Sequence, residues 1–132
     1  MRKQGYTLME VMITIIILGV IASLSLPRLT FSIERTRSAD GLQILNALLS
    51  AQIVYEYENP GAYASDIDDL DITIPASDSF NNFSVADDPT AVASVQRNGA
   101  GGYNYLLEID EDGIVSCDNK TSPSGTCTKL GF

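Results

Sequence analysis

The chain has 132 residues, and its 17 acidic residues outnumber its 8 lysines and arginines, which gives a net charge of −9 with no histidine. This length suits one domain of modest size. The negative charge argues against direct binding of nucleic acid, because affinity for the phosphate backbone rests on lysine and arginine. Without histidine, serine and cysteine nucleophiles lack their ordinary general base, so we expect no enzyme.

The first feature along the chain is an apolar segment over residues 6–26 that contains a single charge, Glu10. As a helix, this segment rises about 31 Å, close to the thickness of a bilayer's hydrocarbon core. An ionised carboxylate inside such a span is costly, and an ionisable residue there is a functional residue by default. We therefore expect Glu10 to need a cationic partner.

Residues 1–5 precede the span and contain Arg2 and Lys3. Under the positive-inside rule, these two cations hold this end in the cytoplasm, so the chain beyond the span faces outward. Cleavage after Gly5 would give Tyr6 a free α-amine with a pKa of roughly 8 at the membrane boundary. That amine could pair with Glu10 of the same helix or of a neighbouring chain, and in the second case assembly would relieve the unpaired charge.

The segment Gly5-Tyr6-Thr7-Leu8-Met9-Glu10, with the long aliphatic helix after it, resembles the N-terminus of the type IV pilin family, which includes the pseudopilins of type II secretion. The resemblance implies that a prepilin peptidase cleaves after Gly5 and that Tyr6 is N-methylated. It also implies that Glu10 pairs with the terminal amine of a neighbouring subunit in a helical filament. Tyr6 departs from the family pattern, in which the first mature residue is most often phenylalanine. The alternative is a membrane anchor that is not cleaved and whose Glu10 side chain extends to the lipid headgroups.

The expected fold is α+β, with one long N-terminal helix packed on a small antiparallel sheet. Its parts are a leader over residues 1–5, a membrane-spanning and assembly helix over 6–27, an amphipathic helix over 28–57 and a β-rich head over 58–132. The resemblance implies as partners other copies, minor pilins, the prepilin peptidase and the pilus assembly machinery. It places the subunit in the inner membrane first and in an extracellular filament later.

Two residues weaken the first part of the helix. Pro27 lacks the N–H that an unbroken helix would donate, which predicts a kink. Gly19 weakens the helix by about 1 kcal/mol relative to alanine. In the family, this stretch extends when subunits pack into a fibre, and a plain kink without consequence is the alternative.

Beyond Pro27, residues recur at three- and four-residue spacing and predict an amphipathic helix to Tyr57 whose stripe covers the sheet. The stripe consists of Leu42, Leu45, Leu48, Leu49, Gln52 and Ile53. Charged residues nearer the membrane, Glu34 and Arg37 among them, are expected on a solvated face. The alternative is that they face adjacent subunits in a filament.

The second half of the chain reads as a sheet with turns. Asn59-Pro60-Gly61 ends the helix, and partial alternation predicts strands over 82–86, 91–97, 103–110 and 114–117. Asp112-Gly113 suits the hairpin turn between the last two strands. The glycine-rich segment 98–102 predicts a flexible turn.

Clustered aspartates raise the question of calcium, a cation that prefers carboxylate oxygens. The clusters are Asp66, Asp68, Asp69 and Asp71, and the run Asp110-Glu111-Asp112. The first cluster lacks the glycine of an EF-hand loop at its expected place and has no glutamate at the twelfth position, and the second suits a hairpin turn. We therefore expect solvated acidic loops, with no metal and no cofactor.

Cys117 and Cys127 are the only cysteines, and an even count outside the inner membrane predicts one disulfide. By the chain-entropy account it would stabilise the fold by roughly 3 kcal/mol. Many pilins have a similar C-terminal disulfide loop, which the abundant secretion pseudopilin usually lacks. The sequence therefore favours a structural subunit of a type IV pilus, active in adhesion or motility. The alternatives are a minor pilin, a type II secretion pseudopilin, or a membrane-anchored periplasmic sensor or binding module.

Overall fold

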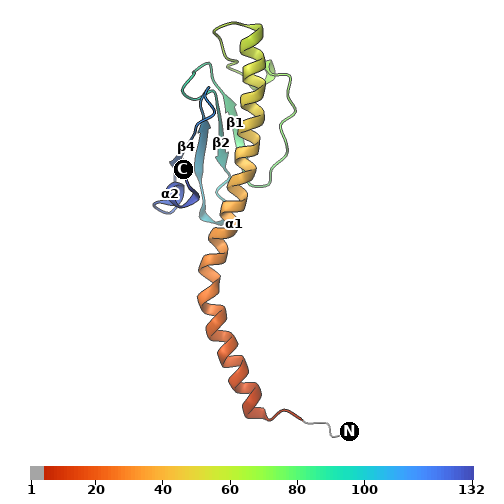
Figure 1. The fold of residues 1–132 in the computed structure, drawn as a ribbon, viewed down its shortest axis with the longest axis vertical. Helices are drawn as coiled ribbons and strands as arrows, with labels where there is room; N and C mark the ends of the chain where they lie inside the picture. The colour runs from red at the N-terminus through yellow and green to blue at the C-terminus, as the bar shows by residue number, and fades with distance from the viewer. Residues whose placement is uncertain (1–4) are drawn as a thin grey trace. The chain divides into compact units, whose positions relative to one another are not determined.

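A computed structural model describes residues 5–132, and residues 25–28 by their backbone alone. The chain divides into two compact units, the N-terminal unit Met1–Arg35 and the C-terminal unit Thr36–Phe132, which are described separately. Helix α1, Leu8–Glu58, contributes residues to both units (Figure 1).

The N-terminal unit exposes apolar side chains on all sides of its helix. Those exposed between α1's start and residue 24 are Leu8, Met9, Val11, Met12, Ile13, Ile15, Ile16, Ile17, Leu18, Val20, Ile21 and Leu24. The hydroxyl groups of Thr14 and Ser23 form hydrogen bonds within the helix. Thr14 Oγ1 donates to Val11 O at 2.7 Å, and Ser23 Oγ donates to Val20 O at 2.8 Å. A helix that is apolar all round needs a cover of lipid or protein.

By length and composition, no single helix in the described part of the chain qualifies as a membrane span, whereas the bent pair Leu8–Leu24 and Leu29–Glu58 qualifies when taken together. The kink predicted at Pro27 falls within residues 25–28, of which the structure describes the backbone alone, as part of α1.

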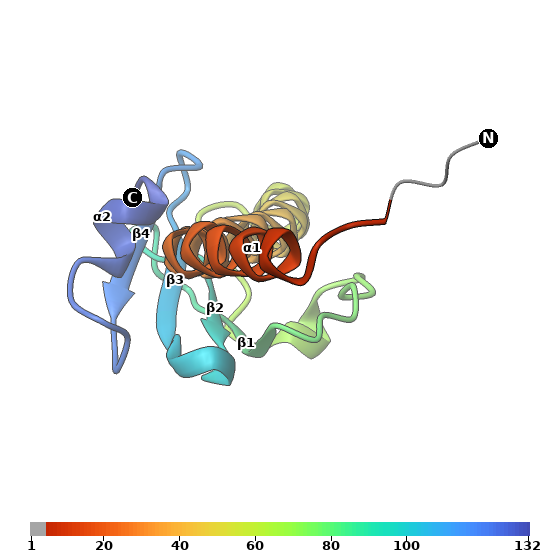
Figure 2. The same ribbon diagram turned by 90° about the horizontal axis from the view of Figure 1, so that it is seen from below.

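The C-terminal unit contains a four-stranded antiparallel sheet in the order β1-β2-β3-β4. The strands are β1 Phe80–Val85, β2 Ala93–Arg97, β3 Tyr105–Ile109 and β4 Val115–Asn119. In this unit, α1 lies against one face of the sheet (Figures 1 and 2). In β2 and β3 buried side chains alternate with half-buried ones. The predicted α+β fold is confirmed.

The core lies between α1 and the sheet. From α1, Ile44, Leu45 and Leu48 are buried, and the sheet contributes Val95, Tyr105, Leu107 and Ile109. The predicted stripe is right at Leu45, Leu48 and Gln52, but it is wrong at Ile53, which is 50 % exposed. Successive residues of a helix are rotated by about 100°. When Gln52 faces the sheet, its neighbour Ile53 therefore points away from it.

Glu34 corrects the prediction of a solvated charged face, because it is only 1 % exposed. The spacing explains this position: Glu34, Ser38, Gly41 and Leu45 recur every three to four residues, so they share one helix face. Ser38, Gly41 and Leu45 are buried too. The prediction from charge alone therefore placed Glu34 on the wrong face of the helix, whereas its spacing from Ser38, Gly41 and Leu45 gives the right face.

Gln52 joins the loop after α1 to the segment that directly precedes β2. Its Nε2 donates to Ala64 O at 2.9 Å and to Val92 O at 3.0 Å, and its Oε1 accepts from the Ala64 N–H at 2.8 Å. The side chain is fully buried, so these bonds replace the water that its amide would otherwise bind.

Gly41 allows α1 to approach the sheet closely. A Cβ at this position would lie 2.7 Å from Cζ of Phe80. The Phe80 ring is itself held edge-to-face against Tyr105, with centroids 6.0 Å apart. The glycine therefore serves the packing of the helix on the sheet, a role that sequence reasoning did not predict.

We expect Gly41→Ala to destabilise the C-terminal unit by about 1–3 kcal/mol, because the added methyl group overpacks the core. This outcome opposes helix propensity, which favours alanine over glycine by about 1 kcal/mol. Urea unfolding of the full chain in detergent, followed by circular dichroism, measures the change. As a control, Phe80→Leu should recover part of the loss when it is combined with Gly41→Ala. Unchanged or raised stability in the single variant would contradict this account of the contact.

The glycine-rich segment 98–102, expected as a flexible turn, contains the short 3-10 helix η2, Ala100–Gly102. Arg97 is 1 % exposed and holds this segment. Its Nη1 donates to Ser79 O at 2.8 Å and to Asn98 Oδ1, and its Nη2 donates to Ala100 O at 3.1 Å. Asn98 Oδ1 also accepts from the Ala100 N–H at 3.0 Å. These bonds give the segment a defined conformation.

The predicted disulfide between Cys117 and Cys127 is confirmed, with the two Cα atoms 5.7 Å apart. It joins β4 to the short helix α2, Thr126–Leu130, whose Thr126, Cys127 and Leu130 are buried. Gly131, at φ 104°, ends α2, and its N–H donates to Cys127 O. Helix α2 was not predicted, because five residues are too few to show a helical period.

Tyr63 ties the loop after α1 to the turn between β3 and β4. Its hydroxyl donates to Glu111 Oε2 at 2.8 Å, and its N–H donates to Asp87 Oδ1 at 2.7 Å. The bond to Glu111, with smaller contributions from desolvation and nearby carboxylates, raises the pKa of Tyr63 from 10.0 to about 12.

This shift predicts a loss of stability in alkali. Below pH 10.0 the phenol is protonated in both states, whereas between pH 10.0 and about 12 it keeps its proton only in the folded state. The stabilisation is therefore complete below the unfolded pKa and disappears as the pH rises through the folded pKa. Urea midpoints measured across this range should fall less steeply for Tyr63→Phe than for the unaltered chain. If the urea midpoint fell equally steeply with pH in both proteins, the result would contradict the hydrogen bond between Tyr63 and Glu111.

Candidate assembly site

Thr7 caps the start of α1 and positions Glu10. The Glu10 N–H donates to Thr7 Oγ1 at 3.2 Å and to Thr7 O at 3.1 Å, and the Val11 N–H donates to Thr7 O at 3.2 Å. Thr7 and Glu10 have the spacing of a capping box, in which a threonine precedes an acidic residue by three positions. Sequence reasoning overlooked this role of Thr7, although the spacing itself is the signal.

The Glu10 carboxylate is open to a partner. Within the described residues it has neither a hydrogen bond nor an ion pair. It borders a shallow, mostly apolar hollow of about 250 Å³, lined by Tyr6, Glu10, Val11 and Thr14. The helix N-terminus favours a negative charge here by about 0.3–1 kcal/mol, which is too little to neutralise it. The site can therefore receive a cation from outside the chain.

Gly5 and Tyr6 lie before the first turn of α1 and are exposed, Tyr6 to 83 %. An added Cβ at Gly5 would meet no atom of the described residues within 4 Å, so these residues leave the bond between Gly5 and Tyr6 accessible. Residues 1–4, the rest of the predicted leader, lie outside the described residues. Because Tyr6 and Glu10 border the same hollow, the predicted terminus and the carboxylate occupy one surface.

Gly19 lies inside α1, and an added Cβ there would also meet nothing within 4 Å. Among the residues that the structure describes, no close approach therefore accounts for the glycine. Its role in extending the helix, together with that of Pro27, stays a prediction.

Several aspartates of the C-terminal unit serve turns. Asp66 Oδ1 accepts from the Asp68 N–H at 3.1 Å and caps the 3-10 helix η1, Ile67–Asp69. Asp88 accepts from the N–H and the hydroxyl of Thr90, and these bonds lower the pKa of the Asp88 carboxyl. In the part of the chain that the structure describes, no three acidic or cysteine side chains gather in a group that could hold a metal ion.

Comparison with known proteins adds independent findings. Residues 1–26 match the family profile described as the prokaryotic N-terminal methylation motif. The chain is 30% identical over 109 residues to the type II secretion system core protein G of Aeromonas hydrophila, which covers 83% of this chain and 67% of that protein. No solved structure matches the chain significantly.

Two further relatives match over a shorter range. The chain is 40% identical over 58 residues to type II secretion system core protein G of Klebsiella pneumoniae and 38% identical over 58 residues to that of Pectobacterium carotovorum subsp. carotovorum. These alignments cover 44% of this chain, and 41% and 37% of the two relatives.

An apolar helix with a carboxylate in its first turn, continuing onto a small antiparallel sheet, defines a pilin-like protein. The chain belongs to the type IV pilin family, and the relatives named above are secretion pseudopilins of that family. The resemblance found at the N-terminus is thereby confirmed.

Proposed function

We propose that this protein is a pseudopilin, a structural subunit of a filament in a type II secretion system. This is the alternative that the sequence left open, and the relatives support it more directly than they support a pilus subunit. The subunit role is carried by one observation: the Glu10 carboxylate, which is open among the described residues, lies on a helix whose apolar surface none of those residues covers.

In this proposal the filament forms when the α-amine of one subunit pairs with Glu10 of the next. A prepilin peptidase removes residues 1–5 and methylates Tyr6, and the exposure of Gly5 and Tyr6 supports access to that bond. An ionised carboxylate is costly in the membrane, so pairing favours the assembled state. The protein is then a structural component without catalytic activity, held in the inner membrane until it enters the filament.

Deleting the gene separates the two filament types. A secretion pseudopilin predicts that exported proteins accumulate inside the cells while sheared surface fibres, counted by electron microscopy, stay unchanged. Loss of surface fibres with normal secretion would instead establish the second candidate, a type IV pilus subunit. The Cys117–Cys127 disulfide is the observation that favours that candidate.

A further inference from the structure

Asn98 and Gly99 form an Asn-Gly dipeptide in the turn between β2 and β3. Of the seven asparagines in the sequence, only Asn98 precedes a glycine. An asparagine in this setting is chemically labile, because the main-chain nitrogen of glycine has no side chain beside it to hinder its attack on the asparagine side chain. Asn98 is exposed, so water reaches it. The dipeptide is therefore a candidate site of spontaneous modification.

The fold requires both residues in succession. Gly99 has a φ of 82°, in the left-handed region that glycine adopts without steric cost. The Asn98 side chain joins two segments, since its Nδ2 donates to Asp78 O at 2.7 Å and its Oδ1 accepts from the Ala100 N–H at 3.0 Å. Asn98 Oδ1 also accepts from Arg97 Nη1. The conformation and the hydrogen bonds of the turn thus place a labile pair here.

The same hydrogen bonds hinder the reaction in the folded protein. Attack requires that Cγ of Asn98 approaches the Gly99 nitrogen, which the side chain can do only after it releases its partners. One of those partners, Arg97, is 1 % exposed and is therefore anchored in the core. The reaction needs a local opening of residues 98–102, and such openings are less frequent in the folded than in the unfolded chain.

We propose that Asn98 is a site of spontaneous deamidation and that the opening of residues 98–102 sets its rate. In the reaction, the Gly99 nitrogen loses its proton and forms a bond to Asn98 Cγ. The bond from Cγ to Nδ2 breaks, and Nδ2 leaves as ammonia. Water then opens the cyclic imide at either of its carbonyl groups, which gives aspartate or isoaspartate. Water is the only other reactant.

Either product changes the turn permanently. Asp78 O loses the donor Nδ2 in both products. Isoaspartate also adds one carbon atom to the main chain before Gly99, which alters the spacing that lets Asn98 Oδ1 reach the Ala100 N–H. Chemical modification of an opened chain makes unfolding irreversible. We therefore expect a chain that stays open long enough to react to refold into a less stable C-terminal unit.

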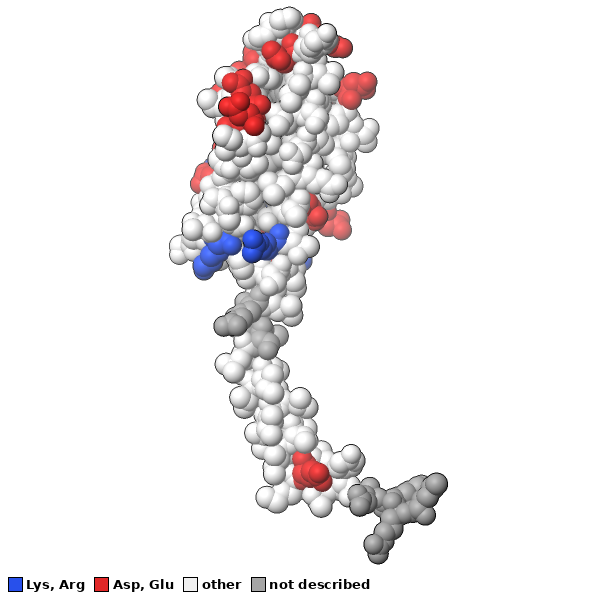
Figure 3. Space-filling model, viewed as in Figure 1, with Lys and Arg blue, Asp and Glu red and all other residues white. Residues whose placement is uncertain are grey.

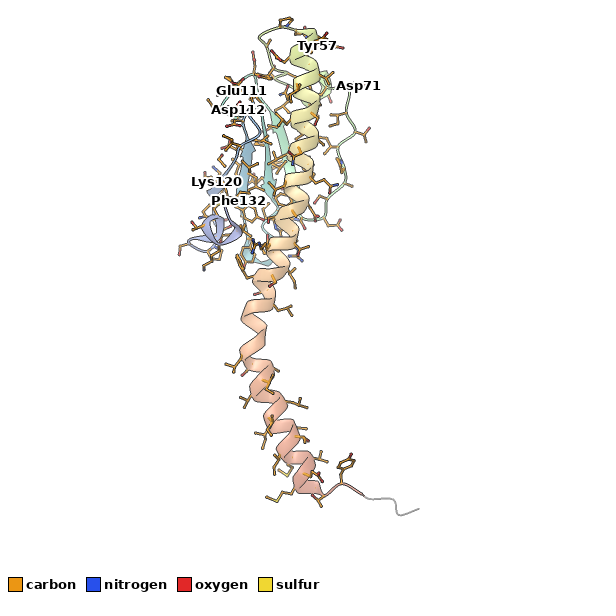
Figure 4. All side chains as sticks on the ribbon, in the orientation of Figure 1. Tyr57, Asp71, Glu111, Asp112, Lys120 and Phe132 are labelled. Atoms are coloured by element: carbon orange, nitrogen blue, oxygen red, sulfur yellow. A yellow bond between two sulfur atoms is a disulfide. The ribbon has the colours of Figure 1, made fainter. Side chains whose placement is uncertain are left out.

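Deamidation adds one negative charge to a unit that is already acidic. The C-terminal unit has four lysines and arginines against fifteen acidic residues. Figure 3 shows acidic side chains spread over the visible face of this unit, and Figure 4 shows Asp71 and Glu111 on opposite sides of α1 in that view. The added charge also provides a way to separate the modified chain from the unmodified chain by ion exchange.

Peptide mapping by mass spectrometry, applied to the full-length chain in detergent, tests the proposal. Samples are kept in mildly alkaline buffer without urea, with urea below the unfolding midpoint, and with urea that unfolds the C-terminal unit. We expect Asn98 to deamidate at least about tenfold faster in the unfolded than in the folded sample. The six other asparagines are internal controls. Because a bulkier residue follows each of them, they should react more slowly than Asn98 in the unfolded sample.

Arg97→Lys tests the role of the hydrogen bonds. It keeps the positive charge but removes the guanidinium that donates to Asn98 Oδ1 and Ala100 O, so deamidation of the folded chain should become faster. If this variant does not fold, the unaltered chain in urea below the midpoint decides, since its rate of deamidation should rise with the fraction of open chains.

Two results would overturn the inference. Equal rates in the folded and the unfolded sample would show that the opening of residues 98–102 does not control the reaction. An Asn98 that reacts no faster in urea than the other asparagines would show that it is not a preferred site. A chain deamidated in urea and then returned to buffer should also have a lower urea midpoint than a chain refolded at once, and equal midpoints would contradict the loss of stability.

Discussion

Replacing Glu10 by alanine is expected to abolish incorporation into filaments while leaving insertion into the membrane intact or improved. An ionised carboxylate is unfavourable in the hydrocarbon core, and its removal takes away both that cost and the attraction for a neighbouring amine. Membrane fractionation measures insertion, and sedimentation of sheared or detergent-released filaments measures incorporation. We expect the variant to fractionate with the inner membrane and to be missing from the pellet.

Glu10→Gln is the matched control, because it keeps the size and polarity of the side chain and removes only its charge. It should fail like Glu10→Ala if ion pairing drives assembly. The Glu10 N–H bond to Thr7 is a backbone bond and is kept in both variants, so the start of α1 should be unaffected. Filaments of normal yield from either variant would contradict the role of the carboxylate.

Replacing Gly5 by leucine is expected to block processing completely. The peptidase has to bind the residue before the cleaved bond. Leucine adds a bulky side chain at this position, where the glycine of the unaltered chain has no side chain. The precursor should then keep residues 1–5 and accumulate in the membrane, without the free amine that Glu10 requires. Mass spectrometry of the purified protein measures the retained segment.

Gly19→Leu is the control for this prediction. Gly5 and Gly19 both have open space around the position of an added Cβ, so neither substitution creates a clash with a described residue. Only the first lies beside the predicted cleavage bond, and Gly19→Leu should therefore be processed normally. Cleavage of the Gly5→Leu chain at the usual rate would show that the bond after residue 5 is not the processing site.

Much of the fold could be predicted from local patterns. Alternation located β2 and β3 because their inward side chains pack on α1, and the turn at Asp112-Gly113 followed from the φ that glycine permits. The disulfide followed from there being two cysteines in one segment. In the candidate site, the apolar run predicted a helix that contains Glu10, and α1 has this residue in its first turn.

The rest depends on contacts between segments that are distant in the sequence. The need for a glycine at position 41 is explained only by its contact with Phe80, which lies far along the chain. Ile53 is exposed because the sheet packs against the neighbouring face of α1. Glu34 is buried although it is charged, since its position on the helix places it with Ser38 and Leu45. No local pattern of hydrophobicity or charge contains this information, because it arises from which face of the helix meets the sheet.

Electron cryo-microscopy of purified filaments tests the central claim most directly, through the position of the Glu10 carboxylate. The account predicts that every subunit begins at Tyr6 and that its α-amine lies within about 4 Å of Glu10 of an adjacent subunit, the distance of an ion pair. Subunits that retain Met1, or a Glu10 carboxylate paired only within its own chain, would contradict it.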